Sequence, residues 1–292
     1  MTPREARSGG EGLERSCERL GDWIASERPA GGVELFRAWF AGEAYETHRH
    51  DTYAVGVTDC GVQVFDYRGA KRVSRPGQIA VLYPDERHDG RAGTADGFGY
   101  HIVYVEPAHL AAAVRGLCGD PSPLPFVRDP VVTDAALAHA IHEAFRAPLE
   151  PLAVDRLMVA LAEGLLAAAH DARHPTMSRI VDVRAVERAR QFLDAERARV
   201  VRSSELETIT GLSRYELARQ FRVALGTSPY RYLVMRRLDF ARERIDRAQP
   251  LADVAYEAGF ADQAHFTRAF KSAFGLTPGR YRTLRANLAR RS

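Results

Sequence analysis

Residues 221–232 read Phe221-Arg-Val-Ala-Leu-Gly226-Thr-Ser-Pro229-Tyr-Arg-Tyr232, and the pattern returns 49 residues later as Phe270-Lys-Ser-Ala-Phe-Gly275-Leu-Thr-Pro278-Gly-Arg-Tyr281. Self-similarity at a fixed offset indicates a repeated structural unit. Upstream of each copy the sequence predicts a short helix that ends at a glycine, Gly211 or Gly259. Each copy is therefore predicted to form a helix, a tight glycine turn and a second helix, which is the helix-turn-helix arrangement.

The spacing of polar and apolar residues predicts where these helices begin and which face they bury. Ser204-x-x-Glu207 and Ser213-x-x-Glu216 have the spacing of capping boxes, which predicts helix starts at both serines. Apolar residues then recur every fourth position and predict the inward faces of the second helices. They are Leu217, Phe221 and Leu225 in the first copy and Phe266, Phe270 and Phe274 in the second. Between the copies, the spacing of Val234, Leu238, Ala241 and Ile245 predicts one long amphipathic helix that holds the two units at a fixed separation.

The outer faces of the two second helices carry mostly side chains that can hydrogen-bond base edges or phosphates. They are Arg214, Tyr215, Ala218, Arg219 and Arg222 in the first, and Gln263, Ala264, His265, Thr267, Arg268 and Lys271 in the second. Net charge points the same way: Val183–Ser292 carries +10 and residues 1–182 carry −7, within a total of +3. A basic segment joined to an acidic one is typical of a polyanion-binding module attached to something else. Two such helices about 34 Å apart would address successive major grooves of DNA.

Residues 251–282, LADVAYEAGFADQAHFTRAFKSAFGLTPGRYR, closely resemble the signature of the AraC/XylS family of bacterial transcription regulators. The resemblance extends over Val183–Arg285 and implies an all-helical DNA-binding domain with recognition helices at Ser213–Leu225 and Asp262–Phe274. Family contacts carried onto matching positions fall on Arg214, Tyr215, Arg219, Gln263, His265 and Arg268. With their neighbours, the expected DNA-binding set is Ser213, Arg214, Tyr215, Arg219, Arg222, Gln263, His265, Thr267, Arg268 and Lys271. Ala218 and Ala264 stand where relatives often have longer polar side chains, so base readout there is unsupported.

The N-terminal half has the residue pattern of β-strands rather than of helices. Residues 33–105 contain short runs rich in Val, Tyr, Phe and Ile between Gly, Pro and Asp turns, which predicts a small barrel or jelly roll. Residues 1–32 are polar and are expected to form a flexible arm with one short helix near residues 13–20. The β region also resembles the cupin-like sensor domain of many such regulators, and this likeness implies an effector site. The fold class expected for the whole chain is α+β.

Three histidines carry the cupin resemblance: His48 and His50, which form an HxH pair, and His88 after a Gly…Pro turn. In metal-dependent cupins an HxH pair, a nearby glutamate and a later histidine hold a divalent metal. On one strand His48 and His50 would point to the same face, so three imidazoles could hold zinc. No glutamate follows His50 at the cupin spacing, which leaves an iron- or manganese-type catalytic site poorly supported. We therefore favour histidines that hydrogen-bond the barrel or an effector. Further candidates for pocket lining are Tyr53, Tyr83, His101 and Tyr104.

Residues 106–170 predict three helices, over 107–117, 132–147 and 152–169. The third carries an apolar stripe at helical spacing, formed by Val154, Leu157, Met158, Leu161, Leu165 and Ala168. Such a stripe is either buried inside the domain or shared with a partner subunit, and we expect it to form a homodimer contact. Residues 171–182 are polar, contain a proline and are predicted to be the linker before the domain at 183–292.

Composition excludes several classes of protein. A length of 292 residues indicates two domains. The three cysteines, Cys17, Cys60 and Cys118, form no CxxC pair, which excludes a disulfide framework and a cysteine-based zinc finger and fits a reducing cytosol. The sequence shows no apolar run long enough to span a membrane and no signal-peptide core, so a cytoplasmic location and no membrane partner are expected.

Together these features favour a transcription regulator that binds double-stranded DNA, responds to a small-molecule effector, requires no cofactor and is not an enzyme. RNA polymerase is an expected partner if the protein is an activator. One alternative is a cupin-type metalloenzyme with a fused helical domain, against which the missing glutamate and the repeat both argue. Another is an N-terminal half that serves only as a dimer or protein-interaction module without a ligand.

Overall fold

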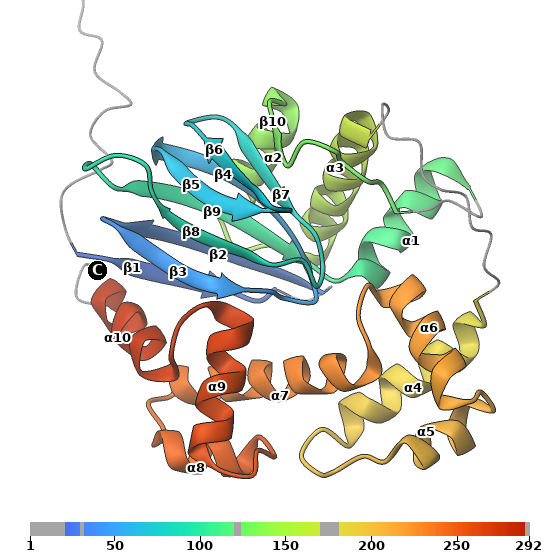
Figure 1. The fold of residues 1–292 in the computed structure, drawn as a ribbon. Helices are drawn as coiled ribbons and strands as arrows, with labels where there is room; N and C mark the ends of the chain where they lie inside the picture. Colours follow the sequence, from blue (N-terminus) through green and yellow to red (C-terminus); the bar gives the residue numbers. More distant parts are fainter. Residues whose placement is uncertain (1–20, 30–31, 120–123, 170–180, 290–292) are drawn as a thin grey trace, which may run out of the picture.

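The computed structural model describes residues 21–29, 32–119, 124–169 and 181–289. It places a β domain next to an all-helical domain, which confirms the predicted α+β class (Figure 1). The strands are β1 (Trp23–Glu27), β2 (Val33–Phe40), β3 (Glu43–His48), β4 (Tyr53–Gly61), β5 (Gln63–Tyr67), β6 (Ala70–Ser74), β7 (Ile79–Leu82), β8 (His88–Ala92), β9 (Phe98–Val105) and β10 (Val131–Val132). The helices are α1 (Pro107–Cys118), α2 (Ala135–Ala144), α3 (Pro151–Ala169), α4 (Val183–Ala195), α5 (Ser203–Thr210), α6 (Arg214–Leu225), α7 (Pro229–Asp246), α8 (Leu251–Glu257), α9 (Gln263–Phe274) and α10 (Pro278–Ala289).

The N-terminal strands form two antiparallel sheets that pack face to face. One has the order β1-β2-β9-β4-β7-β10 and the other the order β3-β8-β5-β6. Aromatic side chains fill the space between them: Phe40 of the larger sheet packs edge-on against Tyr45 of the smaller one, with ring centroids 5.0 Å apart. Phe40, Phe65 and Phe98 are essentially fully buried. This sandwich agrees with the predicted jelly roll.

The expected flexible arm is too long. Residues 23–27 form β1, which pairs antiparallel with β2 from Trp23 opposite Trp39 to Glu27 opposite Leu35. Ile24 of this strand is fully buried, and that burial explains why the segment joins the sheet despite its polar surroundings in sequence. The short helix expected near residues 13–20 lies outside the described residues, as does most of the expected linker.

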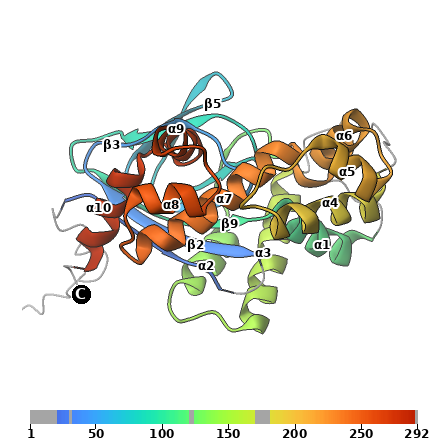
Figure 2. The ribbon, with the colours of Figure 1, turned by 90° about the horizontal axis from the view of Figure 1, so that it is seen from below.

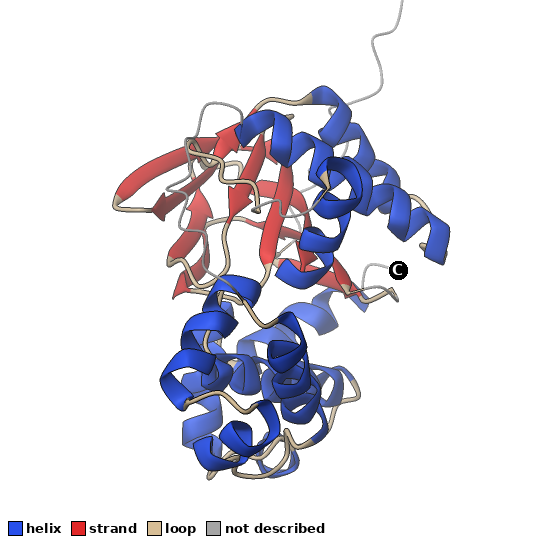
Figure 3. Cartoon of the chain, turned by 90° about the vertical axis from the view of Figure 1, so that its right-hand side faces the viewer, coloured by secondary structure: helices blue, strands red, loops and turns tan. Residues whose placement is uncertain are grey.

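Helices α1, α2 and α3 lie beside the sheets, while the C-terminal helices form a separate group below them (Figure 3). The apolar stripe of α3 faces inward, and Leu157, Leu161 and Leu165 are at most 3% exposed. Helix α2 approaches α3 so closely that a Cβ added at Gly164 would lie 2.7 Å from the side chain of Leu137. The expected homodimer contact through this stripe is therefore wrong, because α1 and α2 already cover it within the domain.

In the C-terminal domain, α7 runs between two helix-turn-helix units, with α5 and α6 at one end and α8 and α9 at the other (Figures 1 and 2). The first unit has its own hydrophobic core, in which Phe221 packs with Leu217 and Leu193. Phe266 and Phe270 of the second unit instead belong to a core that is continuous with that of the sheets. The two units are thus alike in sequence but differ in how they are supported.

Two further expectations concern membranes and cysteines. In the described part of the chain, no helix combines the length and the apolar character that a membrane span requires. Cys118 is a free, exposed thiol, whereas Cys60 is disulfide-bonded. The cysteine count did not predict that bond.

Leu161 provides a test of the α3 interpretation. We expect Leu161→Ala to lower the free energy of unfolding by about 2–5 kcal/mol, because it leaves a cavity in a packed core. Val159→Ala on the same helix should change it by less than about 0.5 kcal/mol, since Val159 is 40% exposed. Urea denaturation measures both values, and sedimentation reports the oligomeric state. A Leu161→Ala protein of unchanged stability that had lost a dimer would contradict this interpretation.

Candidate DNA-binding helices and effector pocket

Local sequence sets the geometry of the first helix-turn-helix unit. Gly211 ends α5 in the left-handed conformation, with φ of 73°, and Ser213 caps α6 by accepting the backbone N–H of Glu216 at 3.3 Å. Glycine adopts this backbone conformation at little cost, which allows the tight turn. The helix start predicted at Ser213 is confirmed.

The capping box predicted at Ser204 is wrong. Helix α5 begins at Ser203, with Arg202 in the capping position, and the backbone N–H of Arg202 donates to the carboxylate of Glu205 at 2.8 Å. Glu207 instead accepts the backbone N–H of Arg214 at 2.8 Å and so joins the two helices of the unit.

The second unit repeats this construction. Gly259 turns the chain with φ of 80°, and a Cβ there would lie 2.7 Å from the carbonyl oxygen of Ala198. Asp262 caps α9 by accepting the backbone N–H of His265 at 2.6 Å. Both recognition helices therefore begin and end where the repeat predicted.

Most side chains of the expected DNA-binding set lie on exposed faces. The exposed ones are Ser213, Arg214, Tyr215, Arg222, Gln263 and Arg268, and the partly buried ones are Arg219, His265, Thr267 and Lys271. Tyr215 is 81% exposed, which is unusual for a large aromatic side chain without a partner surface. The Arg219 guanidinium lies 3.6 Å from the carboxylate of Glu216, one turn earlier on the same helix.

Lys271 is placed differently from the other members of this set. Its ammonium group lies 2.7 Å from the carboxylate of Glu46 in β3, so it faces the N-terminal domain. The backbone N–H of Glu46 also donates to the carbonyl oxygen of Gly275 at 3.1 Å. The C-terminal end of α9 is thus joined to the edge of the smaller sheet.

Glycines at the ends of α6 and α9 mark two close approaches between the domains. A Cβ at Gly226 would lie 2.9 Å from the ring of Pro84, and one at Gly275 would lie 2.6 Å from the carbonyl oxygen of Glu46. These positions correspond to each other in the repeat. Each glycine also needs its positive φ, 71° and 67° respectively, to end its helix.

Arginines of α7 pair with carboxylates of the N-terminal domain. Arg236 lies 2.9 Å from Asp51 and 3.0 Å from Glu106, and Arg242 pairs with Glu34. The side chains of Arg236 and Arg242 are only 16% and 8% exposed. Burial raises the pKa of Asp51 to about 6, although the Arg236 guanidinium acts in the opposite direction. Some of the arginines whose charge indicated DNA binding therefore form ion pairs with the N-terminal domain instead.

A cavity of about 260 Å³ lies where the two domains meet. Its apolar walls are largely aromatic, formed by Phe36, Tyr45, Tyr104, Phe274 and Tyr281. Its charged lining consists of Arg28, Arg236, Arg242, Glu34, Asp51, Glu106 and Asp239. Of the expected pocket residues, His48, His50 and Tyr104 line this cavity, whereas Tyr53, Tyr83, His88 and His101 do not. Sequence reasoning missed the walls from α7, α9 and α10, because no motif joins segments so far apart.

Tyr53 and Tyr83 are core residues instead. Their rings pack edge to face, with centroids 5.0 Å apart, and the Tyr83 hydroxyl donates to the carbonyl oxygen of Pro125 at 2.9 Å. Both are buried, at 4% and 7% exposure. They hold the segment before β10 against the sheet.

The three histidines of the cupin motif do cluster, although His48 ends β3 and His50 lies in the loop after it rather than on the same strand. The His88 ring lies 4.3 Å from that of His48 and 4.9 Å from that of His50, centroid to centroid. Each Nδ1 is hydrogen-bonded to a backbone carbonyl oxygen, at 2.7 to 3.0 Å. Burial lowers the pKa of His88 to about 4 and the pKa values of His48 and His50 well below 6.5. The cluster is therefore uncharged near neutral pH.

The ligand nitrogens of His48, His50 and His88 do not all lie within 4.8 Å of one another, which is wider than the spacing of a formed zinc site. Within the described ranges, the metal-type side chains whose ligand atoms all lie within 4.8 Å of one another are Asp59, His101 and His142. His101 thus belongs to a different site from the one expected. Asp59 and His142 were missed, because neither stands in a recognisable metal motif.

Comparison with known proteins agrees with this arrangement. A helix-turn-helix domain model matches residues 206–284, and an AraC-like ligand binding domain model matches residues 30–167. The uncharacterized HTH-type transcriptional regulator YbfI of Bacillus subtilis is 25% identical over 80% of this chain and 85% of its own length. The transcriptional activator NphR of a Rhodococcus species is 35% identical over 47% of this chain and 39% of its own length.

A solved structure of ToxT from Vibrio cholerae shares the fold, with a TM-score of 0.61 and 13% identity over 90% of this chain and 98% of that one. The two domain models match in the order that the structure shows, a ligand-binding β domain followed by paired helix-turn-helix units. The chain therefore belongs to the AraC family of transcription regulators.

Proposed function

We propose that this regulator reads DNA with α6 and α9 and that a small molecule in the interdomain cavity controls this binding. The observation that carries the proposal is that both recognition helices end against the sensor domain, and that residues of α7 and α9 line the cavity itself. A ligand that changes the contact between the domains would therefore act directly on the helices that read DNA.

The proposed DNA contacts follow the exposed faces of the two helices. Arg219 and Arg268 occupy equivalent positions in the repeat, each near the middle of its recognition helix. Arginine can donate two hydrogen bonds to a guanine edge in the major groove. Lys271 is proposed as a DNA contact only when its ion pair with Glu46 opens.

Arginine and phenylalanine variants distinguish residues that recognise bases from residues that stabilise the fold. We expect Arg268→Ala to leave thermal stability nearly unchanged and to relax recognition at one position by about 1–3 kcal/mol. Arg219→Ala should do the same in the other half of the site. Phe270→Ala should unfold the second unit, because truncating a buried phenylalanine costs about 3–5 kcal/mol.

Selection of bound fragments from random DNA with the full chain gives the operator, and binding to singly substituted operators at two salt concentrations gives the readout. Arg282→Ala, which removes an exposed arginine of α10, is the charge-matched control. Equal weakening of every DNA by Arg268→Ala would make that arginine a phosphate contact. The absence of salt-sensitive binding to any selected DNA would overturn the proposed function.

The lining of the cavity indicates the chemistry of the effector. Three guanidinium groups face four carboxylates there, a formal net charge of −1, and each guanidinium is already paired with a carboxylate. An anionic ligand would have to break one of these partly buried pairs, which is costly. ToxT has been solved with an unsaturated fatty acid bound. For this chain we propose instead an uncharged or basic ligand with an aromatic or apolar body.

Met235 allows the cavity to be tested. Its side chain is 3% exposed and lines the cavity, so a larger side chain at this position would occupy part of the cavity volume. Uncharged aromatic compounds and aromatic amines should raise the Tm of the full chain more than an unsaturated fatty acid does. Met235→Trp should weaken that ligand binding by about tenfold or more, and Leu152→Trp on the exposed side of α3 should not. A larger shift with the fatty acid would contradict the assigned ligand class.

We propose that His48, His50 and His88 act through hydrogen bonds to the barrel or the ligand rather than as zinc ligands. Their lowered pKa values mean that the unfolded chain binds more protons than the folded one below about pH 6.5. The free energy of unfolding should therefore fall as the pH decreases from about 6.5 towards 4. Asp51, whose pKa is raised to about 6, acts in the opposite sense over that range.

Comparison of the wild type with His88→Asn removes the Asp51 contribution, because both proteins share it. The variant should lose stability less steeply between pH 6.5 and pH 4, by about 1.4 kcal/mol for each unit of pKa shift removed. Urea denaturation at a series of pH values measures this slope. Parallel slopes for the two proteins would show that His88 is not titrating as a buried neutral group.

The remaining partners belong to the same proposal. We propose a cytoplasmic location and, if the protein is an activator, contact with RNA polymerase. A homodimer would have to use a surface other than the buried stripe of α3. The metalloenzyme alternative gains no support from the histidine cluster, whose ligand nitrogens do not all lie within 4.8 Å of one another.

A further inference from the structure

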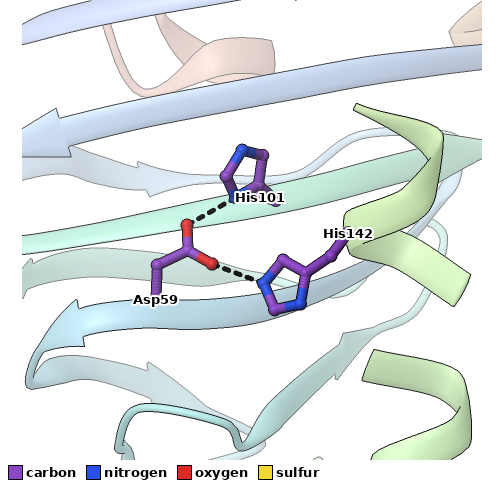
Figure 4. Close-up of side chains that lie close together, drawn as sticks. All are labelled: Asp59, His101 and His142. Atoms are coloured by element: carbon purple, nitrogen blue, oxygen red, sulfur yellow. Dashed lines mark hydrogen bonds and ion pairs between the residues drawn. The ribbon is translucent and has the colours of Figure 1, made fainter. Parts of the chain in front are cut away.

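A second group of ligand-type side chains lies on the outer face of the larger sheet, beneath α2 and away from the interdomain cavity (Figure 4). Asp59 comes from β4, His101 from β9 and His142 from α2. One carboxylate oxygen of Asp59 lies 2.5 Å from Nδ1 of His101, and the other lies 2.7 Å from Nε2 of His142.

Three separate features of the fold bring these side chains together. On β4, Asp59 follows two residues after Val57, whose partner across the β4–β9 pairing is His101, so regular alternation places Asp59 and His101 on the same face of the sheet. The His101 ring is held by the edge of Phe145, with centroids 4.3 Å apart. Asp134 caps α2 by accepting two backbone N–H groups, which fixes the start of the helix that carries His142. The group is therefore built by two paired strands and a capped helix rather than by one flexible loop.

Two imidazoles and one carboxylate form a donor set suited to Zn²⁺ and related divalent transition metals. All three ligand atoms lie within 4.8 Å of one another, so small side-chain rotations bring them to the roughly 2.0–2.2 Å that zinc requires. The side chains of His101, Asp59 and His142 are 24%, 27% and 39% exposed. This exposure leaves room for an ion to enter and for water as a fourth ligand. Nδ1 of His101 is buried and makes no hydrogen bond of good geometry.

We propose that Asp59, His101 and His142 bind a divalent transition metal ion, for which Zn²⁺ is the probe. The ion ties α2 to the sheet, because two ligands come from strands and the third from the helix. This site is independent of the DNA-binding assignment and of the His48, His50 and His88 cluster. The competing interpretation is a metal-free link in which Asp59 accepts a hydrogen bond from each histidine.

Zinc binding to the full chain tests the proposal after removal of bound metal with a chelator. We expect about one Zn²⁺ per chain and a Tm that rises with Zn²⁺ concentration. Co²⁺ should give the visible absorption of a site with nitrogen ligands. His142→Gln and Asp59→Asn should each weaken Zn²⁺ binding by about tenfold or more, and Asp59→Asn keeps the size of the side chain. Circular dichroism in chelator confirms that each variant is folded.

Two control variants make the result specific. His139→Gln changes an exposed histidine one turn earlier on α2 and should leave binding unchanged, as should His50→Gln in the other cluster. Loss of binding in His139→Gln equal to that in His142→Gln would indicate surface binding between two histidines of one helix. Binding lost in His50→Gln but kept in His142→Gln, or no Zn²⁺ bound by the wild type, would overturn the proposal.

Discussion

The arrangement of the two domains depends on the ion pairs between α7 and the sensor domain. Arg236 pairs with Asp51 and Glu106, and Arg242 pairs with Glu34. Removing one member of such a buried pair typically costs about 3–5 kcal/mol, because its partner is left as an uncompensated charge. Helix α7 also joins the two helix-turn-helix units, so these pairs position both recognition helices and one wall of the effector cavity at once.

Local chemistry was enough to predict the helices of the DNA-binding domain and most strands of the sensor. Glycine turns, capping residues and apolar periods act within a few residues, and the starts of α6 and α9 at Ser213 and Asp262 follow from them. Partners in space could not be predicted in the same way. The period of α3 showed that Leu161 is buried but not what buries it, and the net charge could not show that Arg242 pairs with a residue 208 positions away.

The two candidate sites could likewise be predicted only in part from local sequence patterns. His48, His50 and Tyr104 could be placed near an effector from sequence, but the cavity is completed by residues of α7 and α9 that follow a different pattern. The group at Asp59 depends on the pairing of β4 with β9 and on the packing of α2 over both strands, which no local pattern specifies. Both sites therefore arise from tertiary contacts, which periodicity does not encode.

The close approaches at Gly226 and Gly275 have a mechanical consequence. Because the sensor domain contacts each recognition helix at the same point of the repeat, α6 and α9 are both held against it at their C-terminal ends. Together with the ion pairs of α7, these two contacts resist twisting of one recognition helix against the other. The spacing of the two DNA half-sites then depends on the contacts with the sensor domain as well as on the length of α7. Loss of the contact at either Gly226 or Gly275 would broaden the range of half-site spacings that the protein binds.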